Sequence, residues 1–251
     1  MNLLEALEKY VKPQTFPVGI KMLERADFPD RVKTGRDLNR KIATCQAIGM
    51  ARRYGWSIGL TKKDLQCAPG FLVIGFSKPT EYYLEGNLCE KMYTESKKAG
   101  RRTEKETEKF EVGEFKAVLI TPLKYMEESD IVVIYGNSAQ IMRLIQARLY
   151  TSGGKLSSSS SGRLDCSDII VSTLKKDECQ YIVPCYGDRV FSMTQDHEMI
   201  FTIPRSKISL MIKGLEGTHM GGVRYPIPHN LRFQPEFPPS YRKLEEELGC
   251  E

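Results

Sequence analysis

The sequence lacks the short motifs that would identify its function directly. No Cys-x-x-Cys pair occurs, which excludes a sequence-local zinc ribbon or ferredoxin loop. No apolar run approaches the roughly 18–20 residues of a membrane-spanning helix, and the start is acidic and amphipathic, unlike a signal peptide. Three scattered histidines offer no Ser–His–Asp triad. We therefore expect a cytoplasmic protein with no membrane partner.

Excess charge of one sign is also absent. The chain has 37 Lys and Arg against 32 Asp and Glu, which gives a formal net charge of +5. The densest basic cluster, at 97–105, is interleaved with glutamates, so its local field largely cancels. Nucleic-acid surfaces usually carry a stripe of unopposed Lys or Arg with stacking aromatics, which this sequence does not show. We expect no nucleic-acid partner, whereas a small anionic ligand and a homo-oligomer are both compatible with this charge.

Hydrophobic patterning predicts an α+β (mixed α/β) protein that forms a single compact domain over 1–251. With 251 residues, of which 41% are hydrophobic, the chain can bury a substantial core without disulfides. Predicted strands lie at 17–23, 71–76, 115–121, 130–135, 181–183 and 199–203. Predicted helices lie at 2–12, 43–55, 80–98 and 138–149, and others start near 166 and 206. The segment 215–251 is predicted as an extended C-terminal tail with a short helix at 241–248.

Cysteine is the residue that the chain does have in excess, with seven copies. Two segments share one order of parts: a cysteine opens a helix, a Lys-Lys-Asp run follows, and a second cysteine lies next to a proline-containing turn. The cysteines in these places are Cys45, Cys67, Cys166 and Cys185. This repeated order predicts an internal duplication with half-repeats 12–110 and 111–214, and a pseudo-twofold axis near the four thiols. Because the alignment needs gaps, chance similarity is the alternative.

These four thiols form the predicted metal site. Thiolates at helix starts and strand-leading turns suit an iron–sulfur cluster or zinc, and helix N-termini lower the pKa of a thiol. The predicted metal ligands are therefore Cys45, Cys67, Cys166 and Cys185. The alternative is that several of them are buried small hydrophobic residues, as free cysteines commonly are.

A low-complexity run of glycine and serine precedes Cys166 and is predicted as a loop. Its small residues let backbone N–H groups approach a ligand, its hydroxyls can donate, and the following helix start adds positive potential. The predicted ligand-binding residues in it are Gly153, Gly154, Ser160 and Ser161, with charge from Lys155 and Arg163. The chain has no Gly-x-x-x-x-Gly-Lys-Ser/Thr pattern, and a flexible surface loop is the alternative.

A predicted turn at 184–189 places a thiol, a glycine, an acid and a base together. Cys185 and Asp188, together with Cys166, are the candidate catalytic residues. Arg189 is predicted to bind a carboxylate or phosphate with two parallel hydrogen bonds. The alternative is an aspartate that closes a turn and an arginine in a structural ion pair.

Several segments in combination resemble one known family. They are Pro-Val-Gly-Ile-Lys at 17–21, Val-Val-Ile-Tyr-Gly-Asn at 132–137, the Ser/Gly run that ends in Cys166, and Pro-Cys-Tyr-Gly-Asp-Arg at 184–189 with Glu198-Met199 after it. The chain resembles the uncharacterised domain-of-unknown-function family 169, the ArCR family of archaea and anaerobic bacteria, over almost its whole length. The resemblance implies a soluble prokaryotic protein and supplies no activity.

Three functions are compatible with these residues. The leading hypothesis is a protein that binds a cofactor, metal or small anionic ligand at a cysteine-containing site between two similar halves. The second is an enzyme that acts on a phosphorylated or carboxylated small molecule through a cysteine nucleophile. The third is a non-catalytic regulatory or assembly module.

Overall fold

The central element of the fold is one antiparallel sheet. The computed structural model describes residues 1–126, 128–228 and 238–249. The described strands are β1 (Val18–Leu23), β2 (Ile58–Thr61), β3 (Ala117–Pro122), β4 (Ile131–Gly136), β5 (Gln180–Ile182) and β6 (Met199–Pro204). They are arranged in the order β2-β3-β1-β4-β6-β5, and every neighbouring pair is antiparallel.

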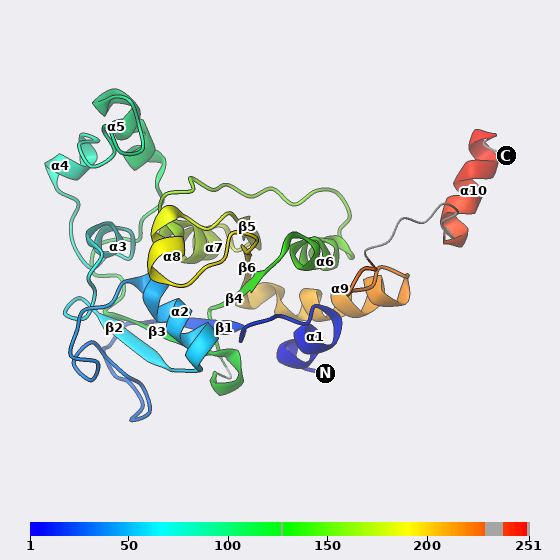
Figure 1. Cartoon of the computed structure of the whole chain (residues 1–251), viewed down its shortest axis with the longest axis horizontal. Helices are drawn as coiled ribbons and strands as arrows, with labels where there is room; N and C mark the ends of the chain where they lie inside the picture. Colours follow the sequence, from blue (N-terminus) through cyan, green and yellow to red (C-terminus); the bar gives the residue numbers. More distant parts are fainter. Residues whose placement is uncertain (127, 229–237, 250–251) are drawn as a thin grey trace.

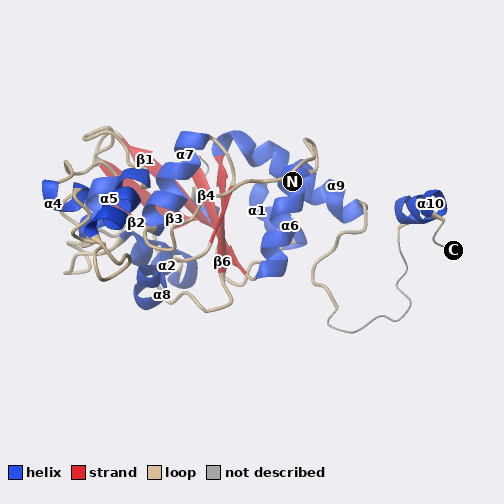
Figure 2. Cartoon of the chain, turned by 90° about the horizontal axis from the view of Figure 1, so that it is seen from above, coloured by secondary structure: helices blue, strands red, loops and turns tan. Residues whose placement is uncertain are grey.

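Helices cover both faces of this sheet (Figures 1 and 2). One face carries α2 (Thr44–Tyr54), α3 (Ala68–Val73), the π-helix η2 (Cys166–Ser172), α7 (Thr173–Lys176) and α8 (Tyr186–Phe191). The other carries α1 (Leu3–Tyr10), α6 (Ser138–Leu149) and α9 (Ile208–Met220). The remaining helices are α4 (Glu81–Leu84), α5 (Lys97–Glu106), η1 (Leu123–Tyr125), η3 (Arg205–Lys207) and α10 (Pro239–Leu248). The predicted α+β class and single domain are confirmed.

The sheet separates two hydrophobic cores. In β4, Val133 and Tyr135 pack into the core under α2, whereas Val132 and Ile134 pack into the core under α6 and α9. This division follows from the two-residue period of a strand, which turns alternate side chains to opposite faces. All six residues of β4 are buried, which explains why the segment is apolar throughout.

The close packing of α6 against α9 leads to a first prediction. A Cβ atom on Gly214 of α9 would lie 1.8 Å from the carbonyl oxygen of Ala147 in α6. Backbone cannot yield as a flexible side chain does, so Gly214→Ala is expected to lower the free energy of unfolding by about 3 kcal/mol. Urea unfolding measures this. Gly221→Ala is the control, because its Cβ would meet no described atom closer than 3.5 Å. Equal losses in the two variants would contradict the argument.

The predicted strand at 71–76 is wrong, because 71–73 belong to α3 and 74–76 form the turn after it. Pro69 lies in the first turn of α3, where its fixed φ angle favours a helix and its missing N–H costs nothing. A short apolar run fits a buried helix as well as a buried strand, so its periodicity could not decide between them. The strand of this region is β2, which the sequence pattern did not indicate.

The predicted helix at 80–98 is also wrong. Only α4 lies wholly within it and α5 begins at Lys97, whereas Leu84 and Met92 of its expected apolar face are exposed. Gly100, expected to end that helix, lies inside α5. A Cβ on Gly100 would come 2.4 Å from the carbonyl oxygen of Gly86, so glycine serves a close backbone approach there.

The strand order is symmetric when the chain is divided between β3 and β4. From the edge to the centre, the half before this division reads β2-β3-β1 and the half after it reads β5-β6-β4. The predicted half-repeats divide the chain at 110/111 instead, which places β3 in the second half-repeat. The halves meet where β1 pairs with β4 over three residue pairs, from Val18↔Val133 to Ile20↔Ile131. A pseudo-twofold axis would produce this arrangement. The duplication stays a prediction, which the strand order supports.

The remaining expectations concern the tail and the membrane. Helix α10 contains the predicted helix at 241–248. The start of the expected extended tail is wrong, because 215–220 belong to α9, and 229–237 lie outside the described residues. In the described part of the chain, no helix has both the length and the apolar character needed to cross a bilayer.

Candidate functional site

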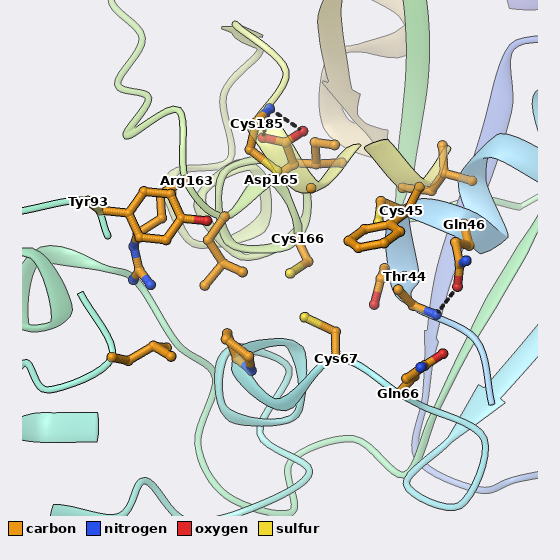
Figure 3. Close-up of a pocket in the computed structure, with 18 of the residues that line it drawn as sticks. Thr44, Cys45, Gln46, Gln66, Cys67, Tyr93, Arg163, Asp165, Cys166 and Cys185 are labelled. Atoms are coloured by element: carbon orange, nitrogen blue, oxygen red, sulfur yellow. Dashed lines mark hydrogen bonds between the residues drawn. The ribbon is translucent and has the colours of Figure 1, made fainter. Parts of the chain in front are cut away.

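A cavity of about 400 Å³ lies at the starts of α2, α3, η2 and α8. All four cysteines of the predicted metal site line it: Cys45, Cys67, Cys166 and Cys185. In Figure 3 the side chains of Cys67 and Cys166 point toward each other across this cavity. We call it the thiol cavity.

Each thiol stands at the beginning of a helix. Cys45 is the second residue of α2, and Cys166 is the first residue of η2. Cys67 and Cys185 are the N-cap residues of α3 and α8. Two cysteines therefore come from each predicted half, and they occupy the places that the repeated order of parts had paired.

Burial keeps Cys45, Cys166 and Cys185 protonated at neutral pH. It raises the pKa of Cys45 and of Cys166 far above the usual range, and the pKa of Cys185 to about 12. Asp165 adds to each shift, because a nearby carboxylate disfavours a thiolate. The expectation that helix N-termini would lower the pKa is therefore wrong for these three thiols, since loss of solvent outweighs the helix dipole.

Two buried carboxyl groups lie beside the thiols. Asp165 lines the cavity, and both its carboxyl oxygens accept from the backbone N–H of Cys185 at 2.9 Å. Burial raises the pKa of Asp165 to about 8, with a further contribution from repulsion by Asp188. Asp188 accepts hydrogen bonds from Ser192 and Thr194 within its own segment, and burial still raises its pKa. Near neutral pH this region therefore carries less negative charge than its residue types suggest.

A family model described as uncharacterised ArCR, domain of unknown function 169, matches residues 6–214. The chain belongs to the ArCR family. An uncharacterized protein of Methanocaldococcus jannaschii is 24% identical over 204 residues, which cover 79% of this chain and 86% of the relative. No solved structure matched the chain. The matched ArCR region contains all six described strands and the four cavity cysteines.

Beneath the thiol cavity, the ArCR domain holds a buried ion pair. Arg52 of α2 donates to both carboxylate oxygens of Glu198, at 2.7 and 3.0 Å. Its guanidinium lies 3.9 Å from the centre of the Tyr135 ring, and the Tyr135 hydroxyl donates to Asp188 at 3.2 Å. Arg52 also donates to Thr194 at 3.1 Å. This network fixes α2, and with it Cys45, relative to the segment that carries Asp188.

Arg163 is the one lysine or arginine among the described residues that line the cavity. Its guanidinium forms a buried ion pair with Glu104 at 2.7 Å and donates to Thr107 at 3.1 Å. Cys89, outside the cavity, donates to the same glutamate at 3.1 Å. The positive charge of Arg163 is therefore largely balanced from α5.

Apart from Arg163, the structure does not bring the predicted anion-binding residues to the thiols. Gly153 and Gly154 are exposed, and no described atom lies within 4 Å of an added Cβ at either. Ser160 Oγ and the backbone N–H of Ser161 donate to Asp168 at 3.3 and 3.2 Å, so this loop surrounds a carboxylate of its own chain. Arg189 donates to the carbonyl of Gln195 at 2.8 Å and does not line the cavity.

No preformed site for a single metal ion is found in the described residues. No three His, Cys, Asp or Glu side chains among them lie close enough together to hold one ion. The six described cysteines are free thiols. Three further residues that line the cavity were not predicted from the sequence: Thr44, Tyr93 and Asp165. Thr44 directly precedes Cys45 and Asp165 directly precedes Cys166, and this adjacency was the available signal for these two residues.

Proposed function

We propose that this ArCR protein binds an iron–sulfur cluster in the thiol cavity. The proposed ligands are Cys45, Cys67, Cys166 and Cys185. The supporting observation is that these four thiols, from four separate segments, surround one cavity. Cysteines that served only for packing would fill this space. Instead they border about 400 Å³, which is the volume of about a dozen water molecules in the liquid.

The charges around the cavity support an occupant that brings positive charge. The thiols, Asp165 and the underlying Asp188 are acidic groups, whereas Arg163 is already paired with Glu104. Metal coordination deprotonates a thiol outright, so binding would proceed with release of protons despite the raised pKa of Cys166. Soft thiolate ligands select zinc, copper(I) or iron–sulfur clusters.

A cluster suits the geometry better than a single ion does. A single tetrahedral ion needs its sulfur ligands within about 2.3 Å, and no three described donors converge in this way. Four thiolates hold an iron–sulfur cluster at its periphery, and the cluster's own iron and sulfide atoms fill the middle of the cavity. The protein would then supply four thiols from helix starts, two from each half.

Iron and sulfide analysis of the anaerobically purified chain tests this proposal. We expect stoichiometric iron and sulfide with visible absorption, before or after reconstitution with iron and sulfide. Cys67→Ser and Cys166→Ser are each expected to lose most of the iron. Cys179→Ser is the matched control, because Cys179 is buried in the other core, against α6 and α9. An iron-free wild-type chain after reconstitution, or equal iron in all variants, would overturn the proposal.

The cysteine-nucleophile alternative makes a different prediction. A nucleophile needs an accessible thiolate, but burial keeps Cys166 and Cys185 protonated. We expect iodoacetamide to label these two thiols slowly at pH 7 in the folded, metal-free chain. Mass spectrometry follows the labelling. Rapid labelling of one of them would favour the enzyme.

A further inference from the structure

The start of α2 leaves hydrogen-bond donors without partners in the thiol cavity. Ala43, Thr44, Cys45 and Gln46 all line it. The first N–H groups of a helix have no partner within the helix, and a side chain at the N-cap usually accepts from them. Here the N-cap is Ala43, whose methyl side chain cannot accept a hydrogen bond, so no side-chain cap is formed. Gln46 Oε1 instead accepts from the N–H of Ala43 at 2.8 Å.

Thr44 provides a second, independent observation at the same place. Its side chain is 2% exposed, and its Oγ1 has no hydrogen-bond partner among the described residues. Figure 3 shows Thr44 at the cavity, between Cys45 and Cys67. A buried hydroxyl without a partner is unfavourable, so this orphaned donor indicates an acceptor atom inside the cavity.

The rest of the lining is mostly apolar. Its apolar side chains include Ile48, Pro69, Leu88, Met92, Leu164 and Phe191. An apolar cavity with a few convergent polar groups is the usual form of a small-molecule site, where the polar groups orient the ligand.

We propose that the thiol cavity binds a small organic acid, with its carboxylate on Thr44 and the first turn of α2. A carboxylate only accepts hydrogen bonds, and a helix N-terminus favours negative charge. The short apolar chain of the acid would lie against side chains such as Ile48 and Phe191. A phosphate fits less well, because this one wall offers too few donors for its additional oxygens and charge. This inference does not depend on the proposed cluster.

Titration of the full chain with butyrate tests the inference. Calorimetry should detect butyrate binding, and butyrate should raise the temperature of thermal unfolding. 1-Butanol, which has the same chain without the carboxylate, should produce neither effect. Thr44→Val is expected to weaken butyrate binding at least tenfold, and Thr44→Ser to retain it. Thr151→Val, at an exposed threonine after α6, is the control and should bind like the unchanged chain.

The outcomes separate this inference from the proposed cluster. Equal butyrate binding by the wild-type chain and Thr44→Val would overturn the subsite, as would a wild-type chain that binds none of acetate, butyrate and benzoate. Iron content is measured on the same samples. Butyrate binding by a chain without iron would support the carboxylate subsite and contradict the cluster. Iron in a chain that binds no butyrate would support the cluster and contradict the subsite. Thr44→Val conserves shape and removes an unpartnered hydroxyl, so it is expected to fold.

Discussion

Arg52→Met is expected to lower the free energy of unfolding by about 3–5 kcal/mol. Arg52 is fully buried, and its two hydrogen bonds to Glu198 are the main compensation for two charges removed from water. Methionine fills much of the same volume but leaves Glu198 buried without its principal partner. Breaking one side of a buried pair costs far more than the pair contributes, because the remaining charge cannot regain its solvation. Urea unfolding followed by circular dichroism measures the loss.

Arg53→Met is the matched control for this prediction. Arg53 also contacts Glu198, at 3.3 Å, but its side chain is 25% exposed. A partly solvated pair contributes little, so we expect a loss of about 1 kcal/mol or less. If both variants lost the same amount, the ion pair would not be what fixes α2. Because α2 also carries Cys45, the first variant should in addition retain less iron than the control.

Asp165→Asn is expected to change the pH dependence of stability. The carboxyl of Asp165 has an ordinary pKa of 3.8 and a pKa of about 8 in the folded chain. The folded state therefore binds more protons than the unfolded state between these values, and the contribution of Asp165 to stability falls as pH rises through that window. Asparagine cannot ionise. The variant should thus gain roughly 3–5 kcal/mol relative to the wild-type chain between pH 4 and pH 9.

The measurement is a series of urea unfolding curves on chelator-treated protein across this pH range. Near pH 4 the two proteins should be similar, with the variant at most slightly weaker, since Asn Oδ1 can still accept from the N–H of Cys185. Part of the difference will arise at Asp188, whose pKa rises through burial and whose charge acts on Asp165. Parallel pH profiles for the two proteins would contradict the prediction.

The meeting of the four cysteines could be predicted from the sequence, although no short spacing connects them. The repeated order of cysteine, helix, Lys-Lys-Asp and cysteine carried topological information, because similar segments in a duplicated fold come to similar places. Cys45 and Cys166 both lie in the first turn of a helix, and Cys67 and Cys185 both occupy the N-cap position of a helix. These are the two pairs that the repeated order predicted. The strands β1 and β4 were predicted from their own hydrophobic patterns.

The rest of the site depends on burial, which the sequence does not express. Nothing in its neighbours shows that Asp165 is held away from water, yet this determines its pKa. The Ser/Gly run has the composition of an anion-binding loop, but Asp168 of the same chain accepts its hydrogen bonds. Helix α3 was mistaken for a strand because six apolar residues lack the length to distinguish the two periods.

The short contact between the two halves has a consequence for cooperativity. β1 and β4 share three residue pairs, whereas β1 with β3 and β4 with β6 each share six. The ladder between these two central strands is therefore half as long as the ladders on either side of it, and the walls of the thiol cavity come from both halves. An occupant ligated by Cys67 on one side and Cys166 on the other would act as a cross-link over this boundary. Its removal would allow the halves to unfold in separate steps, so that a single melting transition would report a filled cavity.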